Sequence, residues 1–391
     1  METQLKKRSF QVLATLGVLG AATTAAHAQS SVTLYGLIDT SLVYSNSQKG
    51  HSNIQMSSGT LSGSRWGLRG QEDLGGGLSA LFVLENGFSS TTGTLGQNGR
   101  EFGRAAYVGL SGGFGKVTAG RQNDTAADFL GALTAANQWA GGLGAHPGNT
   151  DNLYVNERIS NSVKFTSNDY AGFRFSGLFS FGGTAGDFSN NRVWGLGATY
   201  ANGPFVVAAS YVNATTPNTG LFDGTAGAAA ISPNNTPIYS GYASARTLQI
   251  AAVGGAYTFG AATVGLIYSN SKFKDLGSGA ASAPVARFVG DTATFDNLEA
   301  NFRYQLSPAV LLGVAYNYTR THGAGDAHYN QVNAGADYFL SKRTDVYLTT
   351  GWQAASGIDS TGHAATAALW PITASSTSHQ FVTALGLRHK F

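Results

Sequence analysis

Cysteine is absent from the 391-residue sequence, and long apolar stretches are scarce. Without cysteine the chain forms no disulfide, so another device must hold the fold together. Past residue 28, no apolar run exceeds about five residues, whereas a transmembrane helix needs about 20. Proline is also rare, with 8 residues, while glycine reaches 53. These absences exclude a disulfide-bonded scaffold and a helical membrane protein.

The first 28 residues have the pattern of a secretory signal. Lys6, Lys7 and Arg8 precede an apolar stretch at 10–22, and a small-x-small cleavage site follows at 26–28. An apolar stretch of about 13 residues is too short to serve as a membrane anchor. We therefore expect a signal peptide at 1–28 and one mature domain from residue 29 to residue 391.

The charge of the mature chain does not indicate a nucleic-acid partner. Without Glu2 and the three basic residues of the signal, the 24 basic and 21 acidic residues become 21 and 20. A net charge of +1 cannot supply the broad positive field that nucleic acid requires. No nucleic-acid binding is expected.

The mature chain alternates between apolar and polar residues with a period of two, which is typical of β-strands with one apolar face. In 380–391, Phe381 and Leu385 alternate with polar or small residues, and 173–181 and 296–306 follow the same pattern. The polar faces carry Arg, Lys and Glu at mid-strand, and aromatic residues gather near the turns. This combination favours a transmembrane β-barrel over a soluble sandwich.

In 158–165 the alternation is also clear, and it places Ile159, Val163 and Phe165 together on the apolar, outer face. One stretch is less regular: in 246–259, Leu248 and Ile250 are out of step with the aromatic residues that follow. Either a β-bulge or a misplaced strand boundary would explain this pattern.

The connections between these strands alternate in length. Short turns lie at 74–78, 112–115, 169–172, 201–204, 259–262, 306–309 and 340–344, and longer polar connectors lie at 45–61, 89–101, 122–157, 184–191, 213–245, 272–293, 320–328 and 354–377. Seven turns and eight connectors predict 16 strands, with both termini on the side of the short turns. Outer-membrane barrels have this asymmetry, with short periplasmic turns and long external loops.

Closure of the sheet follows from the membrane environment. An open sheet in lipid would leave backbone groups unpaired, so the last strand must pair with the first, at 32–44. An all-β, antiparallel barrel of 16 strands is too wide for side chains to fill. The sequence therefore predicts a water-filled channel.

Six stretches, in order along the mature chain, carry a resemblance to a known family: SSVTLYGLID (30–39), SRWGLRGQEDLGGGLSALFVLE (64–85), RAAYVGLSGGFGKVTAGRQ (104–122), RISNSVKFTS (158–167), YFLSKRTDVY (338–347) and LGLRHKF (385–391). With them the chain resembles the trimeric general porins of Gram-negative bacteria, of beta-proteobacterial type. The resemblance implies a homotrimer in the outer membrane, surrounded by lipid and lipopolysaccharide, whose third loop folds into the lumen. It also implies that Phe391 is the signal read by the outer-membrane assembly machinery.

A channel selects by the charge and width of its narrowest part. We expect Arg65, Arg121 and Arg158 on the lumen side, and the resemblance implies that they form a basic ladder opposite the third loop. Lys164 and Arg174 would extend this ladder. The alternative is that all five are ordinary solvated residues on a polar face.

The connector at 122–157 is the candidate constriction loop, because it is long and follows the predicted ladder directly. Its acids Asp124 and Asp128 would face the arginines and create a transverse field. The alternative is a mobile surface loop with solvated acids. The connector at 213–245 is nearly as long, but its composition favours an external position.

Two further acids, Asp39 and Glu85, also point to the lumen, away from the constriction or paired with nearby arginines. More arginine than acid in the lumen predicts a weak anion preference. On this hypothesis Arg121→Ala shifts the ion preference toward cations.

The sequence thus favours a general diffusion porin that passes ions and small hydrophilic solutes. A substrate-specific channel would need a row of aromatic residues along the lumen, and Tyr35 and Tyr347 alone form none. A barrel enzyme would need Ser, His and Asp clustered at one rim. The GLSGG motif at 109–113 lies in a turn between strands, where a nucleophile elbow does not form. No histidine pair has metal-ligand spacing, so neither catalysis nor a metal or other cofactor is expected.

Overall fold

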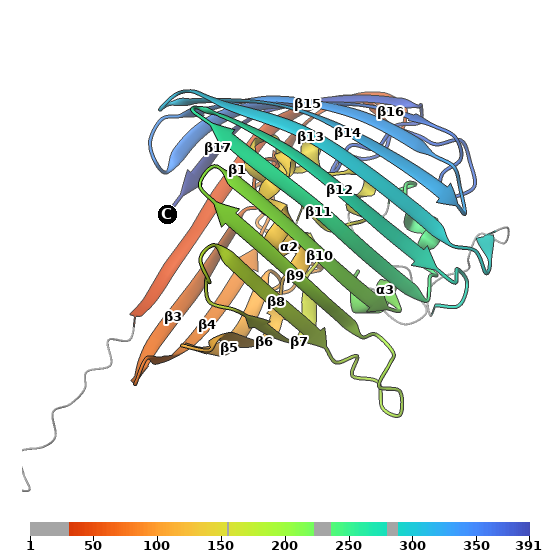
Figure 1. Ribbon diagram of the computed structural model, residues 1–391. Coiled ribbons are helices and arrows are strands. Elements are labelled where there is room, and N and C mark those ends of the chain that lie inside the picture. The colour runs from red at the N-terminus through yellow and green to blue at the C-terminus, as the bar shows by residue number, and fades with distance from the viewer. Residues whose placement is uncertain (1–30, 155, 223–235, 280–287) are drawn as a thin grey trace, which may run out of the picture.

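Antiparallel β-strands form one closed sheet in the computed structural model, which describes residues 31–154, 156–222, 236–279 and 288–391 (Figure 1). The predicted signal peptide lies outside these residues. The strand bounds are β1 Ser31–Gln48, β2 His51–Ser58, β3 Arg65–Gly75, β4 Leu78–Gly87, β5 Ala105–Gly112, β6 Gly115–Gln122, β7 Ile159–Thr166, β8 Phe173–Ser180, β9 Val193–Asn202, β10 Phe205–Thr215, β11 Thr247–Phe259, β12 Ala262–Lys274, β13 Ala293–Ser307, β14 Val310–Gly323, β15 His328–Phe339, β16 Thr344–Ser356 and β17 His379–Lys390.

The first and last strands close the barrel. β1 pairs with β17 from Leu37 opposite Lys390 to Ser45 opposite Val382, and every strand is antiparallel to its neighbours. Two segments, β2 and β3, share one position in the wall, because β2 pairs with the second half of β1 and β3 with its first half. The 17 segments of the described chain therefore form 16 strands around the circumference, which confirms the predicted fold.

Residues 59–64 interrupt the wall between β2 and β3. The side chain of Asp39 binds the backbone of these residues. This side chain is fully buried. One carboxylate oxygen accepts hydrogen bonds from the amides of Leu61 (2.9 Å) and Ser62 (2.6 Å), and the other accepts one from the Tyr347 hydroxyl (2.6 Å). Asp39 thus points inward, as predicted, but it binds the interrupted strand and does not face the open lumen.

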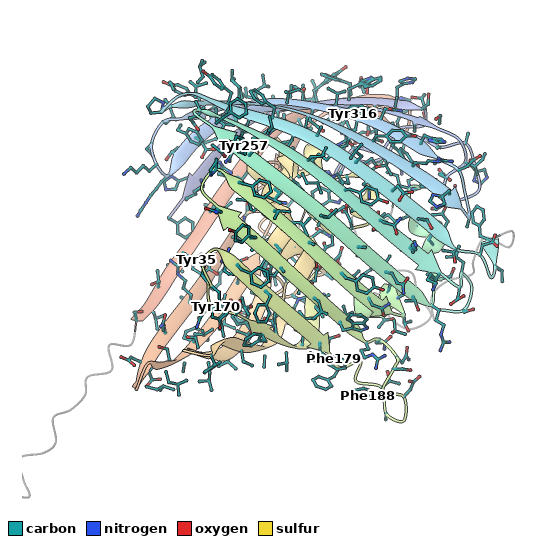
Figure 2. The ribbon with its side chains drawn as sticks, in the orientation of Figure 1. Tyr35, Tyr170, Phe179, Phe188, Tyr257 and Tyr316 are labelled. Carbon is teal, nitrogen blue, oxygen red and sulfur yellow. The ribbon has the colours of Figure 1, made fainter. Side chains whose placement is uncertain are left out.

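The two faces of the sheet differ in polarity as predicted. On β17, Leu385 and Leu387 are more than half exposed on the outside, while Gln380 and Arg388 lie on the inner face. Tyr257 and Tyr316 stand on the outer surface (Figure 2). An apolar, aromatic-bearing outer face suits contact with lipid.

Three apolar residues that the alternation left ambiguous or misplaced face inward. β11 has no bulge, so Leu248 and Ile250 point into the barrel, where both are buried in an apolar cluster. Ile159 belongs to the same cluster, because the register between β6 and β7 shifts at the end of β6, next to the first residues of β7. The shift turns Ile159 inward. The inner face of this part of the wall contacts protein rather than water, so apolar residues are stable there.

Two of the predicted long connectors are short in the structure. Most of 45–61 is strand, with β1 and β2 joined by a tight turn at Lys49 and Gly50, both of which have positive φ. The connection between β14 and β15 spans only 324–327. The remaining long connections, all on one side of the barrel, are 88–104, 123–158, 181–192, 216–246, 275–292 and 357–378.

Residues 123–158, called the inserted loop below, fold into the barrel. Their helical turns lie inside the ring of strands (Figure 1) and are α2 Thr125–Leu130, η1 Gly131–Leu133, η2 Ala136–Ala140, η3 Gly141–Gly144 and η4 Pro147–Asn149. Trp139 packs directly on Gly313 and Gly335 of the wall, where a β-carbon would collide with its ring. Within the described ranges, no helix is long and apolar enough to cross a membrane.

The predicted external connector at 213–245 corresponds to the connection 216–246, which carries α3 Pro217–Gly220 and η5 Ser240–Tyr242. Its described residues pack inward instead. Ile238 and Tyr242 are buried in the cluster that also contains Phe273 and Phe295 of the wall. The loops and one side of the wall thus share an apolar core inside the barrel, and the open path is displaced toward the other side.

The interruption between β2 and β3 generates a stability prediction. Asp39→Ala leaves two amides and a hydroxyl buried without their acceptor, at a cost of about 1–3 kcal/mol for each group. The urea midpoint of the folded barrel, followed by tryptophan fluorescence, should therefore fall. Asp73→Ala is the matched control, because Asp73 is exposed and, among the described residues, accepts a hydrogen bond from the nearby Gly75 amide alone. Equal midpoints for the two variants would contradict the role given to Asp39.

Candidate pore and its constriction

A cavity of about 1230 Å³ lies between the inserted loop and the wall formed by β1–β8. The inserted loop contributes Asp128, Phe129 and Tyr154 to its lining, and Trp370 comes from the connection 357–378. The other side of the lumen is filled by the apolar core. This cavity is therefore the candidate path for solutes.

Basic side chains outnumber acidic ones in the described lining of the cavity. The lining has two acidic residues, Glu85 and Asp128, and seven basic residues: Arg65, Arg69, Arg104, Lys116, Arg158, Lys164 and Arg174. The lining therefore carries five more positive than negative charges. Between low-dielectric walls, such a surplus raises the local concentration of anions and lowers that of cations.

Four of the five predicted basic residues line this cavity. Arg65, Arg158, Lys164 and Arg174 come from β3, the end of the inserted loop, β7 and β8. Lys164 Nζ lies 2.7 Å from a carboxylate oxygen of Asp128. Arg174 is more than half exposed and lies near the short-turn end of β8.

Arg121 lies outside the cavity lining, which corrects its predicted position. On β6, Lys116, Thr118 and Gln122 face the cavity, so Arg121 is out of phase with them. Its buried guanidinium donates to the carbonyls of Gly103 (2.8 Å) and Arg158 (3.2 Å) and to Ser160 Oγ (2.7 Å). Arg121 therefore joins neighbouring segments of the wall.

Asp124 is also corrected, because it caps α2 and does not face the arginines. One carboxylate oxygen accepts from the Ala127 amide (2.8 Å) and the other from the Asn152 side chain (2.6 Å). Aspartate is a favoured N-cap residue for this reason. Burial raises the pKa of Asp124 to about 6, against the lowering effect of these hydrogen bonds. Asp128 is the acid of this loop that reaches the cavity.

Arg104 was missed by sequence reasoning. Its Nε lies 2.7 Å from a carboxylate oxygen of Glu85, and Arg65 approaches the same oxygen at 4.0 Å. The Tyr35 hydroxyl donates to the other oxygen of Glu85 (2.9 Å). Glu85 thus pairs with arginine in the lumen. Arg104 lies at the end of a connection, just before β5, where strand alternation gives no orientation.

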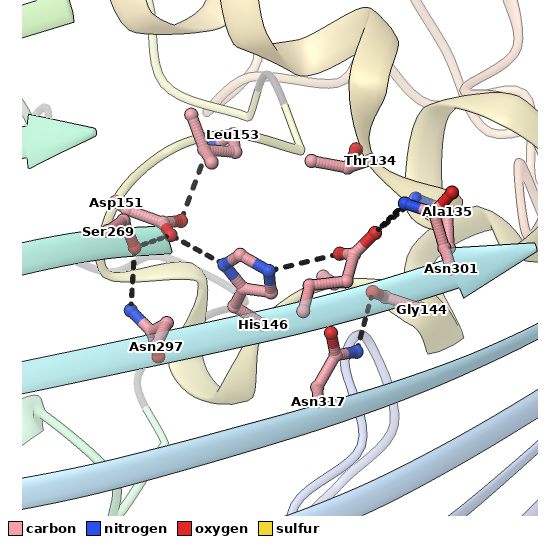
Figure 3. A network of polar contacts seen from close by, with 12 residues as sticks. Thr134, Ala135, Gly144, His146, Asp151, Leu153, Ser269, Asn297, Asn301 and Asn317 are labelled. Atoms are coloured by element: carbon pink, nitrogen blue, oxygen red, sulfur yellow. Dashed lines mark hydrogen bonds and ion pairs between the residues drawn. The ribbon is translucent and has the colours of Figure 1, made fainter. Parts of the chain in front are cut away.

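A buried polar network attaches the inserted loop to the opposite wall (Figure 3). His146 Nδ1 lies 2.6 Å from Asp151 in the same loop, and its Nε2 lies 3.0 Å from Glu299 on β13. Glu299 also accepts hydrogen bonds from the Ala135 amide (2.7 Å) and the Asn301 side chain (2.5 Å). No local pattern could have indicated this contact, because His146 and Glu299 are far apart in sequence.

The charge on His146 follows from its surroundings. Burial alone would lower its pKa, but Asp151 and Glu299 outweigh that effect and raise it to about 10. In return, His146 lowers the pKa of Asp151 against the effect of burial. The imidazole is therefore protonated at neutral pH and sits between two carboxylates.

Neutral amide side chains of the wall add to this attachment. Asn317 donates to the Gly144 carbonyl (3.4 Å, Figure 3), Gln331 to Leu143 (3.0 Å) and Asn333 to Leu143 (2.8 Å). These amides satisfy backbone carbonyls of the inserted loop that would otherwise be buried without a donor. The loop is held along much of its length.

The carboxy terminus completes the seam of the barrel. Phe391 exchanges two backbone hydrogen bonds with Gly36 (3.0 and 3.1 Å), and its ring lies where a β-carbon on Gly36 would be. Its role as an assembly signal stays a prediction. Arg388, nearby on the inner face, contacts Asp345 (3.0 Å) and Asp337 (3.3 Å).

Among the described residues, no group of three or more His, Cys, Asp or Glu side chains could hold a metal ion.

The chain is similar to known outer-membrane porins. A family model described as Gram-negative porin matches residues 14–357. An outer membrane porin protein of Bordetella pertussis is 33% identical over 371 residues, which cover 83% of this chain and 89% of that protein. Outer membrane porin protein 32 of Delftia acidovorans is 30% identical, with 87% and 88% covered.

Solved structures share the fold. The anion-selective porin from Comamonas acidovorans matches with a TM-score of 0.71 and 24% identity, over 93% of this chain and 100% of that chain. A trimer form of OmpT from Vibrio cholerae matches with a TM-score of 0.63 and 16% identity, over 93% and 99%.

The His146 network predicts that alkaline pH loosens the inserted loop. Because the folded pKa of His146 is raised from 6.5 to about 10, its stabilising effect is complete below pH 6.5 and is lost as the pH rises through 10. Proteinase K should cleave the loop of the folded barrel faster at pH 10.5 than at pH 7. The variant His146→Leu leaves two buried carboxylates without a cation, which costs about 3–5 kcal/mol of folding free energy. Proteinase K should therefore cleave the loop of this variant fast at both pH values.

The control for this measurement is His363→Leu, in which an exposed loop histidine is replaced. This variant should keep the slow cleavage at pH 7 and its rise at high pH. Cleavage at the same rate in His146→Leu and in the unmodified protein at pH 7 would show that the network does not hold the loop.

Proposed function

The chain belongs to the Gram-negative porin family, and we propose that its channel prefers anions among the ions and small hydrophilic solutes that it passes. It is a general diffusion porin, a β-barrel of the outer membrane. Proteins of this family are channels, and we assign no catalytic step to any residue here.

One observation carries the proposed anion preference: the surplus of five positive charges in the described lining of the cavity. Arg65, Arg104, Arg158 and Lys164 line the cavity, and Asp128 of the inserted loop pairs with Lys164. Charges act over about 8 Å at physiological ionic strength, so an ion in a narrow passage stays within their reach. Because salt screens them, the preference should weaken as ionic strength rises.

Substitution of single arginines tests this preference. Arg104→Gln should lower the ratio of anion to cation permeability by about two- to threefold, as expected when one charge is removed several ångströms from the ion in a hydrated passage. The reversal potential of the purified channel in a KCl gradient measures this ratio. Arg65→Gln should act in the same direction, and Arg121→Ala should have a smaller effect because Arg121 lies outside the cavity lining.

Arg343→Gln is the matched control, because Arg343 is exposed in the turn between β15 and β16. It should keep the reversal potential of the unmodified channel. A cation-selective unmodified channel would contradict the proposed preference.

We also propose a homotrimer, with the outer face of β2–β6 turned toward the other subunits. OmpT from Vibrio cholerae, which shares the fold, has a trimer form. On this face the exposed residues are aliphatic, including Ile54, Met56, Val108, Leu110 and Val117. The outer faces of β9–β16 carry exposed tyrosine, phenylalanine and tryptophan in addition to aliphatic residues.

Strand length supports this choice of face. β5 and β6 have 8 residues each, whereas β13 and β14 have 15 and 14. Eight residues extend about 26 Å along the strand. When such a strand is tilted by about 40°, its height along the membrane normal is less than the apolar band of about 25 Å. Contact with another subunit would shield β5 and β6, which are too short to span the apolar band, from the lipid.

Cross-linking tests the trimer and its face together. The chain has no cysteine, so Val108→Cys introduces a single thiol on β5. In membranes, a bismaleimide should join pairs of subunits of this variant into covalent dimers, because each subunit carries a single thiol. Leu266→Cys, equally exposed but on β12, should form no covalent dimer under the same treatment, although its unlinked mass should still be that of a trimer. The opposite pattern, or a monomeric mass for the unlinked protein, would contradict the proposal.

Removal of residues 1–28, contact with lipopolysaccharide and recognition of Phe391 by the assembly machinery are further predictions of the family resemblance.

A further inference from the structure

The cationic part of the cavity has donors without acceptors. Arg65, Arg104 and Arg158 line the cavity with a single carboxylate, Glu85, among them. Arg158 is only 2% exposed, and the Nε atoms of Arg65 and Arg158 are buried with no hydrogen-bond partner in the described part of the chain. Three guanidinium groups beside one carboxylate leave a surplus of two positive charges in a largely buried site. A solute carboxylate that meets their cavity-lining ends would offset this surplus through charge-assisted hydrogen bonds.

An aromatic pair lines the same cavity. Tyr154 of the inserted loop and Trp370 of the connection 357–378 meet edge to face, with ring centroids 5.0 Å apart. The Trp370 ring packs on Gly142, where a β-carbon would lie 2.5 Å from it. The indole Nε1 is buried and has no partner among the described residues. The pair is therefore held in place before any solute arrives.

The two parts line the same cavity of about 1230 Å³, and Tyr154 and Arg158 belong to the same end of the inserted loop. Burial and Asp39 raise the pKa of the Tyr154 hydroxyl to about 12, while Arg65, Arg104 and Arg158 lower it, which agrees with this placement. A molecule of modest size could therefore contact the aromatic pair and the arginines at once.

We propose that this part of the cavity is a binding subsite for organic anions with an aromatic ring, of which aryl carboxylates are the simplest. The ring of the solute packs against Tyr154 and Trp370, and its carboxylate binds Arg65, Arg104 and Arg158. Inorganic anions and aliphatic carboxylates use the arginines alone. The inference rests on the proposed channel function and names the solutes that the channel retains longest.

Current block in planar bilayers tests the subsite. Benzoate and cyclohexanecarboxylate have the same charge and nearly the same size, but only benzoate has an aromatic face. Half-maximal block of the chloride current should need about two- to tenfold less benzoate, the range expected for one aromatic contact. Acetate, which lacks a ring, should block least.

Variants locate the effect. Trp370→Leu should abolish the advantage of benzoate over cyclohexanecarboxylate, and Tyr154→Leu tests the other member of the pair. Arg158→Gln should weaken block by both ring compounds by the same factor. The matched control is Trp352→Leu, because Trp352 is exposed on the outside of β16. This control should keep the advantage of benzoate.

Equal block by benzoate and cyclohexanecarboxylate in the unmodified channel would overturn the proposal. So would an advantage of benzoate that persists in both Trp370→Leu and Tyr154→Leu. The reversal potential of the same channels separates this failure from a failure of the proposed function. An anion-selective channel without a preference for benzoate refutes the subsite alone, whereas a cation-selective channel refutes the anion preference itself.

Discussion

Backbone hydrogen bonding in lipid is the constraint on which the rest of the structure depends. Every strand must find two neighbours, and the pairing of β1 with β17 meets this requirement for the last free edges. Closure by backbone bonds explains how the chain holds together without cysteine. Because backbone bonds hold most of the wall, many inward side chains are available to shape and charge the lumen.

The inward face then serves two purposes in two parts of the barrel. On one side, apolar residues such as Phe273 and amides such as Gln331 pack against the loops and bind their backbone. On the other side, basic residues border an open cavity. The position of the inserted loop decides which part is filled and which conducts, so the contact between His146 and Glu299 shapes the pore without lining it.

Lipid contact also decides what could be predicted from the sequence. It forces an apolar residue at every second position, and so β8, β13 and β17 and the number of strands were predictable. The inward face is under no such rule, which is why Leu248 and Ile250 did not fit the pattern. Arg121 near a strand end, Arg104 in a connection and the cap at Asp124 follow local geometry that alternation does not encode. Contacts between distant segments, such as His146 with Glu299, leave no periodic signal.

The inserted loop has a mechanical consequence as well. It leaves the wall after β6, returns to it at β7, and is fixed between these points to β13, β14 and β15. Such a segment ties opposite parts of the barrel wall together. The inserted loop therefore resists flattening of the barrel under lateral pressure from the bilayer. The cavity beside the loop then keeps its width when the surrounding membrane is deformed.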